Sequence, residues 1–183
     1  MKTALSLLAV ATILVAPTLS ATQSNAQFVS PAVRSGIQES AGEISPEVQL
    51  YVGRGDESIS RLSYGAAARD YRKAADVARG EGHLPSATSW MLATALYNDG
   101  DLAGAAAALD GLANEAALVG DLEVEALSIY YSAWLNGKAG RQAETEARVA
   151  RLEGLLGSRY MPGAIRDLLV DRLKTSREVA VRR

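Results

Sequence analysis

The chain lacks cysteine and has a single histidine, and each shortage argues against a class of site. With no cysteine among its 183 residues, it cannot form a disulfide, a thiolate metal site or a lipid-modified cysteine. His83 is the one histidine, and neither metal-ligand spacing nor a Gly-x-Ser-x-Gly turn accompanies it. We therefore expect no catalytic residue, no metal and no cofactor. A hydrolase whose two carboxylates are distant in the sequence stays open as a less favoured alternative.

The chain also lacks a surplus of basic charge. It has 19 Lys and Arg residues against 21 Asp and Glu residues, which gives a formal net charge of −2. Proteins that bind nucleic acid gather Lys and Arg on one surface to contact phosphates. We accordingly expect a protein or peptide partner and no nucleic acid.

The longest apolar run stands at the N-terminus. Lys2 precedes an apolar stretch from Ala4 to Ala16, which Pro17 interrupts, and this order is typical of a secretory signal peptide. The run is shorter than the roughly 20 residues that a membrane-spanning helix needs. Residues 24–26 place small residues where a signal peptidase reads, so we predict a signal peptide over 1–26 and a mature chain from Gln27. The protein is then periplasmic or secreted, without a stable membrane anchor after cleavage.

Alanine is abundant, whereas phenylalanine is nearly absent. This composition favours helices that pack closely through small side chains and argues against a β-sandwich. We predict an all-α fold of antiparallel helical hairpins. The predicted divisions are the signal peptide over 1–26, a polar, partly ordered segment over 27–55, and a helical-repeat domain over 56–183.

Turn and capping residues divide this domain into helices. A short helix begins at Ser45-Pro46-Glu47 and is predicted to end at Gly53 and Gly55, after which Asp56 caps the next helix. Further helices are predicted to end near Gly80, Asn98, Gly120, Gly137 and Leu156, and Asp101 and Asp121 are expected to cap two of them. Pro162 opens a last amphipathic helix that is suited to cap the stack.

The stretch from Ser86 to Ala117 resembles the tetratricopeptide repeat family. The matching positions are Leu92-Ala93, Leu96, the turn residue Gly100, Ala105 at the helix crossing and Leu109. Leu112 stands where the family prefers alanine, the closing proline is missing, and the unit from Leu122 to Leu156 matches more loosely. A generic α-solenoid therefore stays open.

The resemblance implies a scaffold that binds a protein or peptide in a groove lined by the first helix of each pair. Carried onto this chain, the partner-binding positions are Trp90, Thr94, Tyr97, Asn98, Tyr130 and Trp134, with Ala87, Leu127 and Lys138 beside them. The competing interpretation is that these aromatic residues pack in the core or between repeats, as aromatic residues at helical spacing usually do. The alternative function is a structural protein of the cell envelope that self-associates into a homo-oligomer through its Ala-rich faces.

Two short motifs are interpreted as helix ends and not as sites. Residues 54–56 spell the cell-adhesion tripeptide Arg-Gly-Asp, but Asp56 is expected to cap a helix. Residues 99–101, Asp-Gly-Asp, lack the distal ligands of a calcium loop and fit a helix stop and start better.

Overall fold

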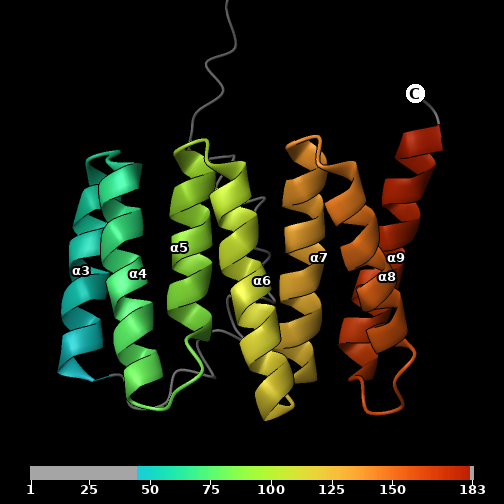
Figure 1. Cartoon of the computed structure of the whole chain (residues 1–183), viewed down its shortest axis with the longest axis horizontal. Coiled ribbons are helices and arrows are strands. Elements are labelled where there is room, and N and C mark those ends of the chain that lie inside the picture. Colours follow the sequence, from blue (N-terminus) through green and yellow to red (C-terminus); the bar gives the residue numbers. More distant parts are fainter. Residues whose placement is uncertain (1–44, 182–183) are drawn as a thin grey trace, which may run out of the picture.

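The computed structural model describes residues 45–181, and this part of the chain consists of seven α-helices without a strand (Figure 1). The helices are α3 (Pro46–Ser60), α4 (Tyr64–Gly80), α5 (Ser86–Asn98), α6 (Leu102–Val119), α7 (Leu122–Lys138), α8 (Gln142–Leu156) and α9 (Gly163–Val181). The prediction of an all-α fold is confirmed. The predicted signal peptide over 1–26 and residues 27–44 of the polar segment lie outside the described residues.

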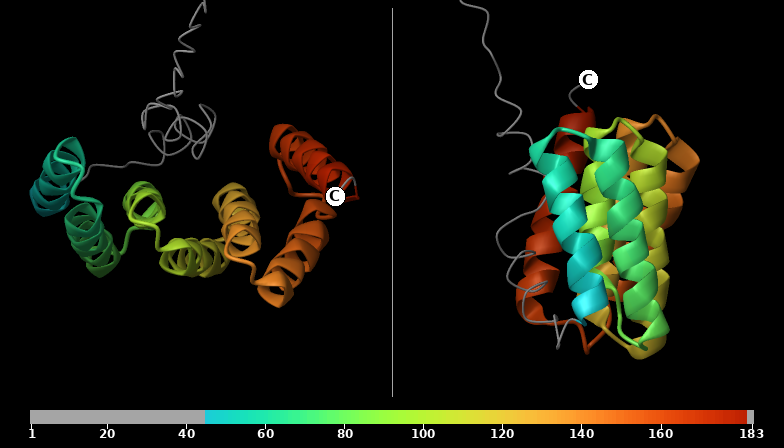
Figure 2. Two further views of the ribbon diagram at one scale, coloured as in Figure 1. Left: turned by 90° about the horizontal axis from the view of Figure 1, so that it is seen from above. Right: turned by 90° about the vertical axis from the view of Figure 1, so that its left-hand side faces the viewer.

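From α3 to α8, each helix packs against the next one along the chain, and α9 contacts α7. Viewed from above, the helices form two rows, and the stack is curved (Figure 2). We call α3, α5, α7 and α9, which lie along the concave side, the inner row, and α4, α6 and α8 the outer row. The inner face is the concave side of the inner row.

The predicted caps form where helices α6 and α7 begin. The Asp101 carboxylate accepts a hydrogen bond from the backbone N–H of Gly104 at 2.7 Å, and the Asp121 carboxylate accepts one from Val124 at 3.0 Å. Each bond satisfies an N–H group that has no partner inside the helix. The sequence therefore located both helix starts correctly.

The same turn occurs three times at intervals of 20 residues. Gly100, Gly120 and Gly140 have φ values of +87°, +76° and +72°, a region that L-residues with a Cβ enter only with strain. In each turn the N–H of the following residue donates to the carbonyl five residues before it, as Asp121 does to Ala116 at 2.9 Å. The glycines thus let consecutive helices reverse direction within two or three residues.

The predicted boundary between the first two helices is wrong. Helix α3 continues through Gly53 and Gly55 to Ser60, so the division placed between residues 55 and 56 falls inside it. The break comes instead at residues 61–63, where Leu62 has a φ of +57°. No glycine or proline marks this turn in the sequence, whereas both glycines of α3 sit in an ordinary helix. Asp56 is a mid-helix residue and not a cap.

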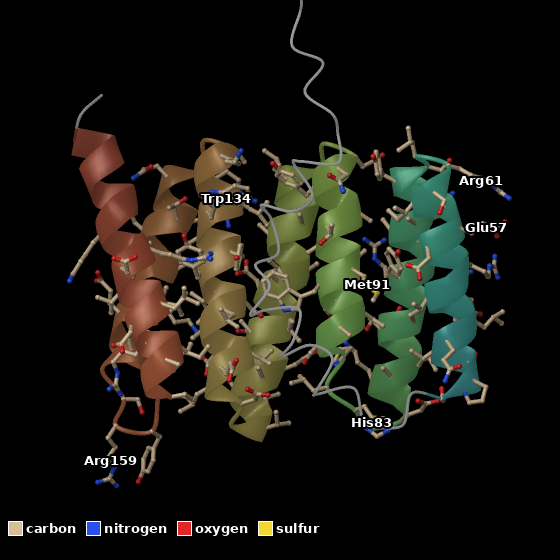
Figure 3. All side chains as sticks on the ribbon, turned by 180° about the vertical axis from the view of Figure 1, so that it is seen from behind. Glu57, Arg61, His83, Met91, Trp134 and Arg159 are labelled. Atoms are coloured by element: carbon tan, nitrogen blue, oxygen red, sulfur yellow. The ribbon has the colours of Figure 1, made fainter. Side chains whose placement is uncertain are left out.

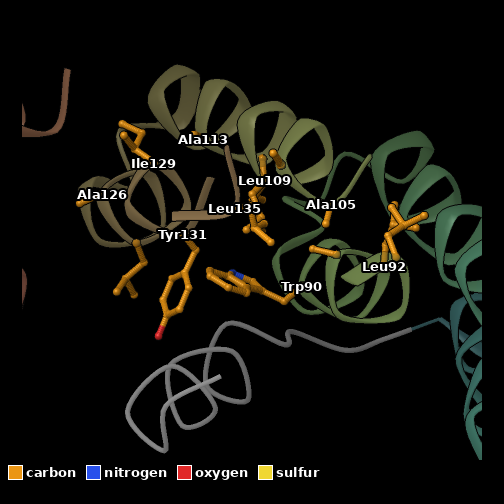
Figure 4. Close-up of a cluster of buried hydrophobic side chains, with 14 of the residues drawn as sticks. Trp90, Leu92, Ala105, Leu109, Ala113, Ala126, Ile129, Tyr131 and Leu135 are labelled. Atoms are coloured by element: carbon orange, nitrogen blue, oxygen red, sulfur yellow. The ribbon is translucent and has the colours of Figure 1, made fainter. Parts of the chain in front are cut away.

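The main core lies between α5, α6 and α7 (Figure 4). Leu109 and Leu135 are fully buried, and so are alanines from all three helices, among them Ala93, Ala105 and Ala126. Small side chains at these contacts let the helix axes approach closely. Helix α7 is buried on several sides because it packs against α6, α8 and α9. Within the described residues, α6 is the one helix long and apolar enough to cross a membrane, and it packs between α5 and α7.

Candidate functional site

The predicted partner-binding residues come from two helices of the inner row. Trp90, Thr94, Tyr97 and Asn98 belong to α5, and Tyr130 and Trp134 belong to α7. Figure 3 views the inner row, with Met91 of α5 and Trp134 of α7 labelled on that side. The fold therefore brings the two predicted sets together on neighbouring helices, although their role in binding stays a prediction.

Tyr97 and Trp134 form an aromatic pair across the α5–α7 contact. Their ring centroids lie 5.7 Å apart with an interplanar angle of 36°, and both side chains are partly buried. The Nζ atom of Lys138, which is exposed, lies 4.7 Å from the centroid of the Trp134 ring and 5.9 Å from that of Tyr97. The ammonium group of Lys138 is attracted electrostatically by the negatively charged faces of the two rings. We call these three residues the Tyr97–Trp134 cluster.

A second aromatic group links α5, α7 and α9. Trp90 is only 3 % exposed, and its ring meets the ring of Tyr131 edge-on at 5.1 Å. Tyr130 meets Tyr131 at the same distance and in the same geometry. The Nη1 atom of Arg172 donates a hydrogen bond to the Tyr131 hydroxyl at 2.9 Å, and its guanidinium lies 5.7 Å from the Tyr130 centroid. We call Trp90, Tyr130, Tyr131 and Arg172 the Tyr131 group.

The aromatic residues of the inner row differ in exposure and therefore in what they offer to a partner. Trp90 packs inside the core, as the competing interpretation of the aromatic residues expects, whereas Tyr97, Tyr130 and Trp134 are only partly buried against it. The Thr94 hydroxyl donates to the carbonyl of Trp90 at 2.8 Å, within its own helix. Asn98, near the end of α5, is partly buried as well.

Sequence reasoning missed Tyr131 and Arg172 as members of the inner row's aromatic groups. Tyr131 falls on an apolar face of α7, so the helical period places it near the predicted residues but does not say which helix it meets. Arg172 is 41 residues away from Tyr131 in the sequence and reaches it because α9 contacts α7. No local pattern could have indicated that contact.

The outer row is joined by ion pairs and not by aromatic rings. Arg79 of α4 pairs with Glu115 of α6 at 2.8 Å, and Arg148 of α8 pairs with Asp110 of α6. Arg151 of α8 pairs with Glu125 of α7 at 2.7 Å. The bond to Asp110 raises the pKa of the Arg148 guanidinium, which burial alone would lower. These cations are thus matched to carboxylates of neighbouring helices.

The remaining motifs of the sequence carry no reactive geometry in the described part of the chain. Among residues 45–174, no three His, Asp or Glu side chains gather as metal ligands would. His83 is exposed in the loop between α4 and α5 (Figure 3). The Arg-Gly-Asp tripeptide lies within α3, where Gly55 is buried and the Asp56 carboxylate accepts a hydrogen bond from the Tyr71 hydroxyl at 2.6 Å.

What the inner row offers is aromatic surface with cations beside it. Tyr and Trp rings supply large contact areas at low cost in conformational entropy, and Lys138 adds a positive charge at the edge of the pair. Such groups can bind through apolar and cation–ring contacts. Comparisons of the chain with protein-family models, with curated proteins and with solved structures give no match.

Proposed function

We propose that the protein is an exported, non-enzymatic adaptor or scaffold, which binds a protein or peptide partner on the inner face of a tetratricopeptide-repeat-like stack. The observation that carries the proposal is the Tyr97–Trp134 cluster. Its two rings come from successive helices of the inner row, they are partly buried, and a lysine lies over them. Partly exposed aromatic residues with a neighbouring cation are frequent anchors of protein interfaces.

The repeat-like part of the proposal is supported by the α5–α6 pair. The positions that match the tetratricopeptide pattern are those that pack this pair together. Ala93 and Ala105 are fully buried, and Leu92, Leu96 and Leu109 surround them. Gly100 has the positive φ that the tight turn needs. Helix α9 covers the end of the stack, as a capping helix does.

The choice of the inner face over the outer face rests on charge pairing. On the outer row, Arg79 of α4 and Arg148 and Arg151 of α8 already pair with carboxylates of this chain. A partner would have to replace those bonds with equally good ones to gain affinity there. On the inner row, the partly buried rings of Tyr97 and Trp134 add aromatic contact area, and Lys138 adds a positive charge beside them.

Photo-cross-linking in the native envelope tests this proposal directly. The chain has no cysteine, so a single Asn98→Cys substitution carries a benzophenone at one known place on α5. The matched control is Ala117→Cys, an exposed position on α6 of the outer row. We expect Asn98→Cys to give cross-links to another protein that Ala117→Cys does not give. Equal cross-linking from both positions, or cross-links only between copies of this chain, would contradict the proposal and favour self-assembly.

Affinity measurements on the captured partner test the cluster itself. We expect the double substitution Trp134→Ala, Lys138→Ala to weaken binding by about tenfold or more, because truncating an interface anchor costs about 1–2 kcal/mol or more. Arg159 and Tyr160 form a similar cation–ring pair in the α8–α9 loop, at 4.6 Å, outside the inner row. Arg159→Ala, Tyr160→Ala is therefore the matched control and should bind as the wild type does. Equal loss in both variants, with intact helicity, would count against the inner face.

Export is tested by the mass of the protein recovered from the envelope or the medium. A chain that begins at Gln27 is expected, because residues 24–26 fit the cleavage pattern. Recovery of the uncleaved chain from the cytoplasm alone would contradict this part of the proposal.

A further inference from the structure

We infer that the outward face of α4 is a second binding surface, on which Arg69, Arg72 and Lys73 bind an acidic segment of another protein. This surface belongs to the outer row and shares no residue with the Tyr97–Trp134 cluster (Figure 2). The inference therefore goes beyond the proposed function and is tested separately from it.

Two arginines of α4 differ from the other arginines of the described chain. Among the arginines of residues 45–174, Arg69 and Arg72 are the two that form no ion pair, hydrogen bond or ring contact. Each of the others binds a carboxylate, a backbone carbonyl or an aromatic ring of this chain. Arg69 and Arg72 are also exposed. Their guanidinium groups are therefore available to a carboxylate from another molecule.

The carboxylates nearest to these arginines along α4 are already engaged. Asp70 pairs with Arg54 of α3 at 3.6 Å, and only 14 % of its side chain is exposed. Asp76 pairs with Arg79 of its own helix at 2.8 Å. The positive charges between these two pairs are thus not neutralised by their neighbours in the helix.

Lys73 extends the two arginines into a patch of three positive charges. Its Nζ atom lies 5.6 Å from the centroid of the Tyr51 ring, and it forms no ion pair with a carboxylate in the described part of the chain. Residues three and four positions apart share one face of a helix, where their Cβ atoms are about 5–6 Å apart. The opposite face of α4 is buried in the core. We call Arg69, Arg72 and Lys73 the α4 patch.

The partner that fits the α4 patch best is an acidic peptide segment. Each guanidinium can hold a carboxylate through two parallel hydrogen bonds. Glutamates three or four positions apart on a helix, or alternating along an extended strand, repeat at about 5–7 Å, which matches the spacing of the patch. The chain as a whole has a net charge of −2, so the patch is a local positive surface that directs an acidic partner to α4.

Two other occupants fit the α4 patch less well. Peripheral binding to an anionic membrane uses large apolar side chains beside the cations. Large apolar side chains that are exposed in the described chain all lie outside α4, at Leu50, Leu62, Leu118, Val119 and Tyr160. A second copy would need an interface of about 1,200 Å² or more, and a polar helix face lacks the apolar centre of such an interface.

Fluorescence anisotropy of a labelled acidic peptide tests the inference on the purified protein. The probe is a fluorescein-labelled peptide of about ten residues in which Glu and Gly alternate, and a second probe carries Gln in place of Glu. We expect the Glu peptide to bind and the Gln peptide not to bind. Arg69→Gln, Arg72→Gln should raise the Kd about fivefold or more, because two charge pairs are lost. Since neither arginine contacts the rest of the fold, the helicity and the Tm should stay unchanged.

The matched control is Arg61→Gln, Arg141→Gln, which removes the same charge from two arginines that already pair with a glutamate three or four residues away. It should change the Kd less than about twofold. Trp134→Ala, Lys138→Ala should also leave the Kd unchanged, because these residues lie on the inner row. Raising the NaCl concentration from about 50 mM to about 0.5 M should weaken binding to the wild type, since salt screens exposed charges.

Four results would overturn the inference. Equal weakening by the two arginine pairs would mean that the peptide responds to net charge and not to the α4 patch. Weakening by Trp134→Ala, Lys138→Ala alone would assign the peptide to the inner face. Binding of phosphatidylglycerol vesicles in place of the Glu peptide, lost in Arg69→Gln, Arg72→Gln, would assign the patch to a membrane surface. A dimer in sedimentation that the same double substitution dissociates would assign it to a second copy.

Discussion

Gly55 shows how one absent side chain positions another residue. It is buried in the middle of α3, where a Cβ atom would lie 2.7 Å from Cδ1 and 2.8 Å from Cζ of the Tyr71 ring. Tyr71 is only 4 % exposed, and its hydroxyl is held by Asp56. Glycine is therefore required here for close packing of α3 on α4 and not for a turn.

The substitution Gly55→Ala should destabilise the protein by about 1–3 kcal/mol, because the methyl group overpacks the Tyr71 contact. Gly53→Ala is the matched control two residues earlier in the same helix. A Cβ at Gly53 meets nothing within 4 Å, so alanine should stabilise by about 0.5–1 kcal/mol through its helix propensity. Urea unfolding followed by circular dichroism measures both, and the same sign for the two variants would contradict the packing argument.

Tyr71 also predicts how stability depends on pH. Burial, and then the hydrogen bond to Asp56, raise the pKa of its hydroxyl above the usual value of about 10. The folded state thus holds the proton more tightly than the unfolded state. Its contribution to stability is complete below pH 10 and is lost as the pH rises above that value, by up to about 1.4 kcal/mol per pH unit.

We therefore expect Tyr71→Phe to be less stable than the wild type at pH 8, by about 0.5–1.5 kcal/mol, but to lose less stability between pH 9 and pH 11. Tyr160→Phe, whose ring is 69 % exposed, is the control and should follow the wild-type curve. Parallel curves for the wild type and Tyr71→Phe would show that Tyr71 is not the group that titrates.

At the scale of the elements, the helices are defined by their ends. Helix α6 has an Asp101 cap at its start and Gly120 in the left-handed region after its last turn. Its interior is mostly alanine and leucine, which have high helix propensity. Helix α3, by contrast, tolerates two interior glycines because its packing on α4 outweighs their low propensity.

Loss of the α6 cap should destabilise the whole stack. Asp101→Ala is expected to cost about 1 kcal/mol, because the N–H of Gly104 then has no side-chain acceptor. For a domain of this size that corresponds to a fall in Tm of about 4 °C. Asp101→Asn should stay near the wild type, since asparagine caps equally well. Equal losses in both variants would point to the charge and not to the hydrogen bond.

At the scale of the whole molecule, the two rows are held together by different chemistry. The inner row is joined by rings, as in the Trp90–Tyr131 contact, and the outer row by ion pairs. Arg148 is the most connected of these ions: it bonds to Asp110 on α6, to the Ser132 hydroxyl on α7 at 3.1 Å, and to the carbonyl of Glu144 at 2.9 Å. It thereby fixes three successive helices.

The pair of Arg148 and Asp110 should show energetic coupling in a double-mutant cycle with Asp110→Ala and Arg148→Met. Both side chains are about a quarter exposed, at 24 % and 26 %, so we expect about 1 kcal/mol of coupling and not the larger value of a buried pair. The control cycle on Arg141 and Glu144, an exposed pair within one turn, should give clearly weaker coupling, because solvent screens exposed charges. Equal coupling in the two cycles would mean that the ion pair between α6 and α8 stabilises the protein no more than an exposed pair within one helix.

How far the sequence predicts the structure is clearest from particular residues. Asp101 and Asp121, with Gly100 and Gly120 before them, marked helix ends correctly because capping involves residues three or four apart. The end of α3 at Ser60 was missed because the turn uses Leu62 in a left-handed conformation that its residue type disfavours. For the candidate site, the period of α5 and α7 indicated which residues share a face, but not that Tyr97 meets Trp134 or that Trp90 is buried.

Local sequence patterns predict the all-α class, most helix ends and the apolar faces, since propensity, capping and helical period act over a few neighbouring residues. Which of these faces meet depends on how the helices pack in three dimensions. The contacts of Arg172 with Tyr131 and of Arg148 with Asp110 join residues 41 and 38 positions apart. They depend on the curvature of the stack and on the order in which helices become neighbours, and no local pattern encodes either of these.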